Sequence, residues 1–222
     1  MKARHLSPAA VLPAGSGSGQ QPPVPVEQEP HHQVLWKNEF AEVIHVLLPA
    51  GESTLFHTHS RDHVAVDLTH TTIALQRLNE PEGQPEPTAP GNVSARANAD
   101  QPFSHRLRNL GPATFEAIDV EFFQRPRHPA QPGAPAVVAE NPSARVYQWS
   151  LTPGAATTVH AHRHPYVLLA VTPVRLKTTT PDGNASVEDF KAGDYRWVDT
   201  TVPHTLSNAG GAEGQIFEIE MK

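Results

Sequence analysis

Histidine is the residue type through which this chain could do chemistry, because it has 14 histidines and no cysteine. The lack of cysteine excludes disulfide bonds, thiolate catalysis, zinc fingers and iron–sulfur clusters. Two segments share the pattern Gly-x5-His-x-His, and each is followed further along the chain by His-x3-Asn. The histidines of these motifs are His57, His59 and His105 in the first half, and His160, His162 and His204 in the second. A lone His-x-His pair is weak evidence, but its repetition with matched spacing predicts metal binding.

The spacing within each pair suits a β-strand. Side chains at i and i+2 of a strand lie on the same face, so His57 and His59 are expected to point into one cavity. A third imidazole from another hairpin, His105, completes a set of ligands on one face of an ion and leaves coordination positions open. Gly51, and Gly154 in the second half, permit the tight turn before each pair. The alternative is that these are core or rim histidines with satisfied hydrogen bonds.

The elements that must position these histidines are themselves repeated. The segment from Gly51 to His59 aligns with the segment from Gly154 to His162 at an offset of 103 residues. The two His-x3-Asn motifs align at an offset of 99, and each half ends on a similar strand-like run. Short apolar runs between turn signals, without helical periodicity, predict an all-β chain made of two copies of one domain.

Proline and glycine mark the expected boundaries of these domains. The chain has 23 prolines among its 222 residues, and they gather outside the strand-like runs. Residues 1–33 are expected to form a disordered arm, and residues 125–142 a proline-rich linker. The first barrel is expected over residues 34–124 and the second over residues 143–222.

Composition limits the partners of the chain. Its net charge is -6 and its pI is near 6.1, which argues against nucleic acid or an anionic membrane surface as a partner. The sequence has no apolar run long enough for a transmembrane helix, and no secretory signal is evident, which favours the cytoplasm. The expected partner is a small-molecule substrate, and a homodimer formed through sheet edges is a further option.

The duplicated motifs resemble those of the cupin superfamily, and their duplication resembles a bicupin. The family's first motif is Gly-x5-His-x-His-x3-4-Glu-x6-Gly, and its second is Gly-x5-Pro-x-Gly-x2-His-x3-Asn. The resemblance covers roughly residues 34–222 and implies two tandem double-stranded β-helix (jelly-roll) barrels that bind metal. In the second half Gly193 occupies the first position of the second motif, whereas the first half has Ser94 there. The glutamate of the first motif is replaced by His63 in one copy and by Tyr166 in the other.

The resemblance implies two ligand sets. The first set is His57, His59, His63 and His105, and the second is His160, His162 and His204, with Tyr166 beside it as a candidate ligand or proton donor. Four neutral imidazoles leave a divalent ion its full charge, which favours an anionic ligand and a transition metal: Fe(II) first, with Zn, Ni, Cu or Co as alternatives. The alternative for His63 is that it replaces a packing aromatic residue, as at its mate position.

Three further groups of polar residues lie outside the two histidine sets. Asp67 lies at i+4 from His63 on a strand-like run, so it is a candidate general base, or else an ion-paired structural residue. Asn109 and Asn208 are expected to be hydrogen-bonding turn residues and not ligands. His31 and His32, near the end of the expected arm, are expected to be exposed to solvent.

These features favour a metal-dependent enzyme that acts on a small organic molecule in the first barrel. Its chemistry is expected to resemble that of cupin dioxygenases, in which a histidine-held metal binds substrate and O₂. One alternative is a Lewis-acid enzyme with Zn or Ni, such as an isomerase, cyclase or hydrolase. The other is a bicupin that binds a metal or a small molecule without catalysis.

Overall fold

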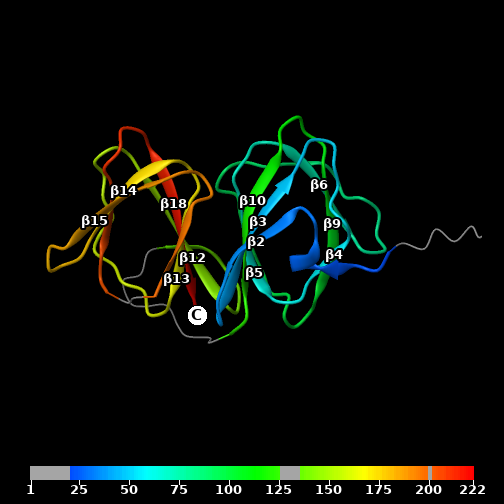
Figure 1. Cartoon of the computed structure of the whole chain (residues 1–222), viewed down its shortest axis with the longest axis horizontal. Helices are drawn as coiled ribbons and strands as arrows, with labels where there is room; N and C mark the ends of the chain where they lie inside the picture. The colour runs from blue at the N-terminus through cyan, green and yellow to red at the C-terminus, as the bar shows by residue number, and fades with distance from the viewer. Residues whose placement is uncertain (1–20, 126–135, 200–201) are drawn as a thin grey trace, which may run out of the picture.

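The computed structural model describes residues 21–125, 136–199 and 202–222. Two β-barrels lie side by side (Figure 1). The elements of the first barrel are β1 (Val24–Pro25), the 3-10 turn η1 (Val26–Gln28), β2 (His32–Lys37), β3 (Ala41–Leu48), β4 (His57–His59), β5 (Asp62–Asp67), β6 (Thr72–Arg77), β7 (Glu86–Pro87), β8 (Val93–Arg96), β9 (Phe103–Asn109) and β10 (Phe115–Phe122). Those of the second barrel are β11 (Val137–Glu140), β12 (Ala144–Leu151), β13 (Tyr166–Ala170), β14 (Val174–Thr179), β15 (Ala185–Phe190), β16 (Tyr195–Val198), β17 (Thr205–Asn208) and β18 (Gly214–Met221).

Each barrel is made of two sheets. In the first barrel the strand orders are β1-β4-β9-β6-β7 and β2-β3-β10-β5-β8. In the second they are β11-β12-β18-β13-β16 and β15-β14-β17. Strands pair in antiparallel fashion except β1 with β4, which are parallel. The prediction of an all-β chain with two tandem jelly-roll barrels is confirmed, and among the described residues no helix is long and apolar enough to cross a membrane.

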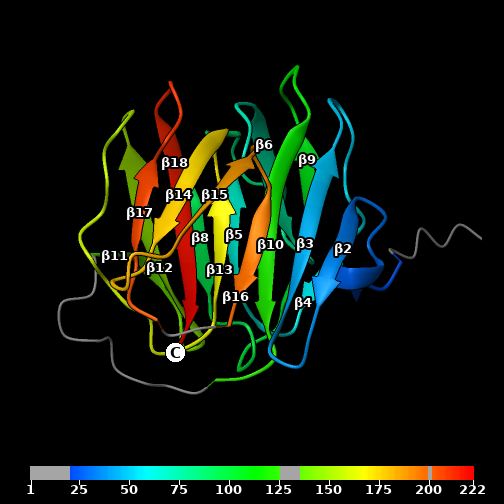
Figure 2. The ribbon, with the colours of Figure 1, turned by 60° about the vertical axis from the view of Figure 1, so that its left-hand side comes forward.

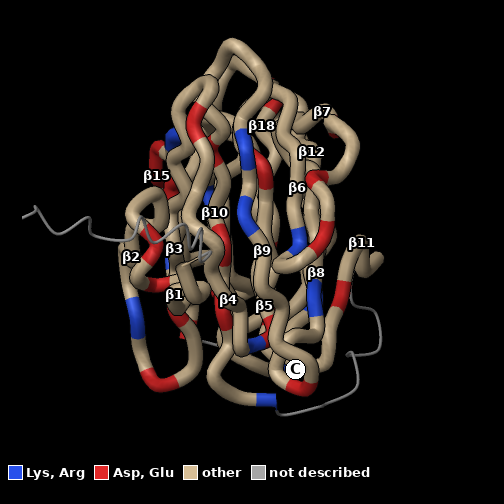
Figure 3. Tube along the Cα trace, turned by 90° about the vertical axis from the view of Figure 1, so that its right-hand side faces the viewer, with Lys and Arg blue, Asp and Glu red and all other residues tan. Residues whose placement is uncertain are grey.

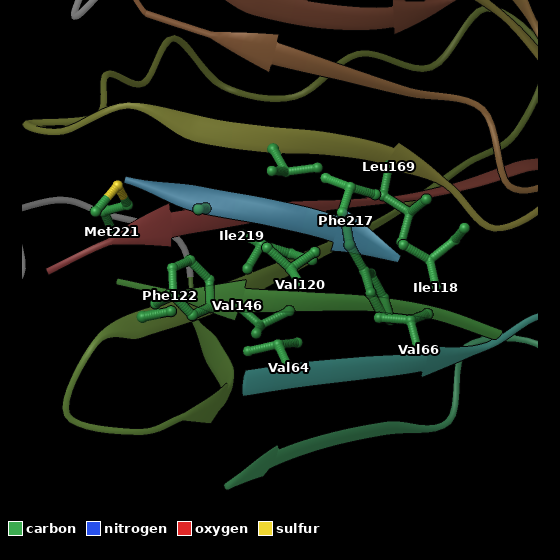
Figure 4. Packing of buried hydrophobic residues seen from close by; sticks show 14 of the residues in the cluster. Val64, Val66, Ile118, Val120, Phe122, Val146, Leu169, Phe217, Ile219 and Met221 are labelled. Atoms are coloured by element: carbon green, nitrogen blue, oxygen red, sulfur yellow. The ribbon is translucent and has the colours of Figure 1, made fainter. Parts of the chain in front are cut away.

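The main hydrophobic core lies between the two barrels. Figures 1 and 2 show β10, β3 and β5 of the first barrel beside β12, β18 and β13 of the second. In β10 the side chains of Ile118 and Val120 point into this shared core, and in β18 those of Phe217 and Ile219 do so (Figure 4). Burying each such side chain contributes about 1.5–3 kcal/mol, so the barrels stabilise each other.

Strand alternation sends the residues between these core positions into the barrels. In β10, Asp119 and Glu121 alternate with the core residues, and both are buried. In β18 the same positions are Glu218 and Glu220, which are also buried. Successive side chains of a strand point to opposite faces, so one strand supplies both the shared core and the barrel interior.

The turn before each histidine pair is built in the same way in both halves. Gly51 has φ +80° and Gly154 has φ +79°, a left-handed conformation that side chains disfavour. The N–H of Gly51 donates to the carbonyl of Asn109, and the N–H of Gly154 donates to that of Asn208. The side-chain amide of Asn109 donates to the carbonyl of Leu48. The expected turn roles of the glycines and asparagines are therefore confirmed.

The expected arm, residues 1–33, and the expected linker, residues 125–142, both include residues that belong to the barrels. Residues 1–20 and 126–135 lie outside the described residues, but residues 24–33 belong to the first barrel, where β1 pairs with β4 and β2 pairs with β3. Likewise β11, inside the expected linker, pairs with β12. Pro25 is tolerated in β1 because an edge strand need not donate a hydrogen bond from every residue. Proline content alone therefore misplaced these boundaries.

Candidate metal centres

Three histidines meet inside the first barrel. β4 pairs with β9 so that His57 lies opposite His105, and His59 follows on the same face of β4. All three are buried, and their potential ligand atoms lie within 4.8 Å of one another. The Nε2 atoms of His57 and His105 are 2.8 Å apart. Two nitrogens bound at about 2.1 Å to one ion, at right angles, would lie about 3 Å apart, so the spacing fits a shared metal.

Hydrogen bonds orient two of these rings. Nδ1 of His57 donates to the carbonyl of Leu55 at 3.0 Å, and Nδ1 of His59 donates to Oε1 of Glu121 at 2.7 Å. Each bond places the proton on Nδ1 and leaves the lone pair on Nε2, as in most metal-binding histidines. Nδ1 of His105 has no hydrogen-bond partner among the described residues.

Burial keeps the first-barrel imidazoles neutral. Burial, together with the neighbouring His32, lowers the pKa of His57 and that of His59 to about 3. Burial also holds the pKa of His105 well below its usual range. A neutral imidazole is the form that binds a metal, so at neutral pH protons compete little for this site.

His63 belongs to a second, overlapping group in the same barrel. This group combines His59 and His63 with Asp119 and Glu121. The ring of His63 lies 4.3 Å from that of His59, and its Nδ1 accepts a hydrogen bond from the amide of Asn98 at 3.1 Å. His63 therefore stands beside the three-histidine set, within a group that also contains carboxylates.

The second barrel brings three histidines and one glutamate together. These residues are His160, His162, His204 and Glu218, all buried, with potential ligand atoms within 4.8 Å of one another. The carboxylate of Glu218 lies 3.0 Å from Nε2 of His160 and 3.2 Å from the Nε2 atoms of His162 and His204. It also accepts a hydrogen bond from Nε1 of Trp149 at 2.7 Å.

Hydrogen bonds at Nδ1 orient two imidazoles of this set so that their other ring nitrogen faces a carboxylate. Nδ1 of His160 donates to the carbonyl of Thr158, and Nδ1 of His204 donates to that of Val202. The Nε2 atoms of His160 and His204 face the carboxylate of Glu218 at 3.0 and 3.2 Å. Such an arrangement needs a cation between the groups, either protons or a metal ion, so the donor set suits a metal.

The histidine sets of the two barrels differ in charge. Although burial lowers it, hydrogen bonds to Glu218 and Glu220 raise the pKa of His162 to about 9. Burial opposes ionisation of Glu218, but bonds with the three imidazoles hold its pKa well below its usual range. The second set therefore contains its own carboxylate, whereas the first set consists of neutral rings.

One methylene group accounts for this difference. Asp119 in β10 occupies the position of Glu218 in β18, at the same offset of 99 residues that aligns the His-x3-Asn motifs. Asp119 is one carbon shorter, and among the described residues its Oδ1 has no hydrogen-bond partner. Burial and the neighbouring Glu121 and Glu42 raise its pKa well above its usual range. The first histidine set is therefore not closed by a carboxylate.

The first set opens onto a cavity of about 230 Å³. His59, His63 and His105 line it, together with the predicted base Asp67. Burial raises the pKa of Asp67 to about 6. The spacing of His63 and Asp67 on β5 placed both on this interior face, as expected for strand alternation.

Tyr166 lies against the second set. Its ring is 4.1 Å from that of His162, and its hydroxyl is 3.4 Å from Nε2 of His204. Burial and the charge of Glu218 raise its pKa, so the phenol stays protonated. Tyr166 and His204 also line a shallower pocket of about 330 Å³.

Sequence reasoning missed two residues at the first site. His32 was expected to be exposed but is 8% exposed, lines the cavity and places its ring 4.6 Å from that of His57. Glu29, in the expected arm, is 1% exposed and contacts Nδ1 of His32 at 2.5 Å. The sequence carries no signal for them, because their position depends on the pairing of β1 with β4 and of β2 with β3.

The buried carboxylates of the last strands were missed as well, although a signal was present. Asp119 and Glu121 in one half, and Glu218 and Glu220 in the other, stand at matching i and i+2 positions of apolar strands. Acidic residues spaced in this way on a strand share one face. Their repetition pointed to the same interior as the histidines.

Comparisons with known proteins agree with this architecture. No family model matches the chain. The beta-alanine degradation protein BauB of Pseudomonas aeruginosa is 33% identical over 88 residues, which is 40% of this chain and 92% of BauB. AerE from Microcystis aeruginosa has a TM-score of 0.61 at 11% identity, over 90% of this chain and 98% of AerE. A cupin 2 conserved barrel domain protein from Leptotrichia buccalis has a TM-score of 0.53 at 12% identity, over 86% of this chain and 88% of its own.

Enzymes are found among the structural neighbours. Salicylate 1,2-dioxygenase from Pseudoaminobacter salicylatoxidans has a TM-score of 0.54 at 14% identity, over 82% of this chain and 71% of its own. Oxalate decarboxylase is another neighbour, with a TM-score of 0.55 at 12% identity. At these identities the likeness concerns the fold. Together with the two barrels and their repeated histidine motifs, it shows that the chain has the two-barrel form of the cupin fold, and the match over nearly all of BauB makes the chain a relative of that protein.

Proposed function

We propose that the first barrel is a metal-dependent enzyme site that acts on a small organic molecule. One observation carries this proposal: His57, His59 and His105 form a neutral set that opens onto the cavity of about 230 Å³. Three protein ligands with a free side toward a cavity are the arrangement of a catalytic metal, whereas structural sites are closed. The curated relative BauB is a beta-alanine degradation protein, and beta-alanine is itself a small organic molecule.

The donor set favours a transition metal. Imidazoles suit Fe, Ni, Cu and Zn better than Mg or Mn, which prefer oxygen ligands. We favour Fe(II) and dioxygenase-like chemistry. Bound here, Fe(II) would supply redox chemistry with O₂, whereas Zn or Ni would supply Lewis acidity for isomerisation, cyclisation or hydrolysis.

Residues of the chain would handle the proton and orient the substrate. Asp67 faces the cavity with a pKa of about 6, so at neutral pH it is ionised and can accept a proton from substrate. Because Nδ1 of His63 accepts from Asn98, its Nε2 carries the proton. We therefore assign His63 the role of hydrogen-bond donor at the cavity wall in place of the expected fourth ligand.

In the second barrel, Glu218 closes the histidine set. We propose that this set, if it takes up a metal, holds it in a structural role, with His160, His162, His204 and Glu218 as donors. Tyr166 would then act through its hydrogen bond to His204 and not as a ligand. The second barrel is thus not the proposed site of reaction.

Metal analysis of paired variants tests the proposal. The full chain would be loaded with Fe(II), Zn or Ni in separate samples, and bound metal measured for the parent, for His57→Ala/His59→Ala and for His160→Ala/His162→Ala. We expect the first variant to lose both one metal per chain and O₂ consumption with substrate, while the second keeps activity. Zn or Ni bound in preference to Fe(II) would favour the Lewis-acid alternative. Failure of all three ions to bind the first barrel would refute an enzyme function.

A further inference from the structure

The first-barrel cavity contains one guanidinium group that is not held in an ion pair by any described residue. Among the described residues that line it, Arg96 is the only lysine or arginine. Arg96 ends β8, a strand that is labelled in Figure 3, and it pairs in register with His63 on β5. Side chains of directly paired residues lie on the same face of a sheet, so Arg96 enters the cavity beside His63.

Among the described residues, no aspartate or glutamate forms an ion pair with Arg96. In the described part of the chain, the arginines that form ion pairs are others, namely Arg61, Arg108, Arg125, Arg145, Arg175 and Arg196. The ranges outside it contain no aspartate or glutamate at all. The guanidinium of Arg96 instead lies 5.1 Å from the centre of the Phe103 ring. Stacking on an aromatic ring holds a guanidinium in place and leaves its N–H groups available.

Asp67 and Glu86 also line the cavity, but neither forms an ion pair with Arg96 in the described part of the chain. On the side of the histidine set, Arg96 is paired with His63, whose ring lies 4.3 Å from that of His59. A half-buried cation without a counter-ion is costly, and a planar guanidinium binds a carboxylate through two parallel hydrogen bonds.

The rest of the wall indicates what else the ligand must contain. Apolar side chains form much of it, namely Val46, Ile73, Leu75, Val93, Leu107 and Phe115. The volume of about 230 Å³ is below the range of about 300–1,000 Å³ that holds drug-sized ligands. The ligand is therefore small and has an apolar body next to its anionic group.

We propose that Arg96 binds the carboxylate of a small organic acid whose apolar body fills the first-barrel cavity beside His59 and His105. This names the substrate class of the proposed enzyme and rests on that function for its catalytic meaning. The binding of the acid itself depends only on the cavity and on Arg96, so it can be tested separately from metal loading.

Calorimetric titration of the full chain with benzoate and with benzamide, its uncharged analogue, tests the proposal. Arg96→Gln removes the charge, and Arg96→Lys keeps it without the planar guanidinium. Arg77→Gln is the matched control, because Arg77 lies 4.9 Å from the centre of the same Phe103 ring but does not line the cavity. We expect benzoate affinity to fall at least tenfold in Arg96→Gln, to fall less in Arg96→Lys and to stay unchanged in Arg77→Gln. Benzamide should bind weakly to all four proteins.

Other outcomes would overturn the proposal. Equal benzoate affinity of the parent and Arg96→Gln would do so. So would a parent that binds neither benzoate nor hexanoate, a second small carboxylate with an apolar body. If Arg96→Gln loses its circular dichroism spectrum or its metal and Arg96→Lys does not restore benzoate binding, Arg96 is structural. If carboxylates bind through Arg96 but the first barrel takes up no metal, the enzyme proposal fails while this inference holds.

Discussion

At the scale of single residues, the two barrels differ in the charge of their interiors. The histidines of the first barrel are neutral and face a cavity, and those of the second surround the carboxylate of Glu218. The equivalent Asp119 is one carbon shorter and does not close the first histidine set. A one-carbon difference therefore separates an open set of ligands from a closed one.

Asp67 provides a pH test at this scale. Its pKa is about 6 in the folded protein, against about 3.9 in an unfolded chain. The folded state binds this proton more tightly, so Asp67 costs stability as pH rises from about 4 to 6. Asp67→Asn should be about 1–2 kcal/mol more stable than the parent at pH 7.5 and no more stable at pH 4, as measured by urea unfolding. Asp189→Asn, at an exposed position, should show no such pH dependence.

Glu218 and Asp119 form a matched pair for a second test. In metal-depleted protein, Glu218→Gln should lower the free energy of unfolding by about 3 kcal/mol, because the three imidazoles lose their anionic partner. Asp119→Asn should change it by less than about 1 kcal/mol, because that carboxyl is already neutral and its Oδ1 has no partner to lose. Equal losses in the two variants would contradict the assigned difference between the barrels.

At the scale of elements, the segment η1–β2 is part of the first site. Glu29 accepts hydrogen bonds from the backbone N–H groups of His31 and Leu55 and contacts the ring of His32. These bonds connect the start of the barrel to the chain just before β4. The segment therefore helps to cover His57.

Removal of the Glu29 carboxylate tests this connection. Glu29→Ala leaves two part-buried N–H groups without an acceptor and His32 without its carboxylate partner, so we expect a loss of about 2–4 kcal/mol in urea unfolding. The matched control is Glu27→Ala, in the same 3-10 turn but exposed, which should change stability by less than about 0.5 kcal/mol. Similar losses in both variants would mean that the segment acts through its backbone alone.

Sequence reasoning succeeded where local spacing determines geometry. The i and i+2 rule brought His57 and His59 together, and the repeat predicted the partners of each set. It failed where distant pairing determines geometry, as for Glu29 and His32, because composition does not reveal which strand a short edge segment joins. It also passed over Glu218, because attention went to histidines and not to the inward positions of the last strand.

At the scale of the whole molecule, the shared core makes the two barrels one folding unit. Val120 and Phe217 are fully buried between them. Barrels that share a core of this kind are expected to unfold together. A proline-rich connection in the sequence therefore does not mean two independent domains.

Calorimetry of core variants checks this expectation. Phe217→Ala should cost about 3–5 kcal/mol and lower the temperature of a single transition, with both barrels melting together. Val187→Ala, on the exposed face of β15, should leave that temperature nearly unchanged. Two separate transitions in the parent, with only one shifted by Phe217→Ala, would contradict a common folding unit.

The alternation along β10 and β18 has a consequence for how duplicated barrels can diverge. One face of each strand contributes to the shared core, and the other carries Asp119 or Glu218 toward the histidines. A substitution on the inner face can therefore alter reactivity with little effect on the contact between barrels. After duplication one copy can keep a reactive interior while its twin becomes a scaffold, and this chain has the arrangement of such a division of labour.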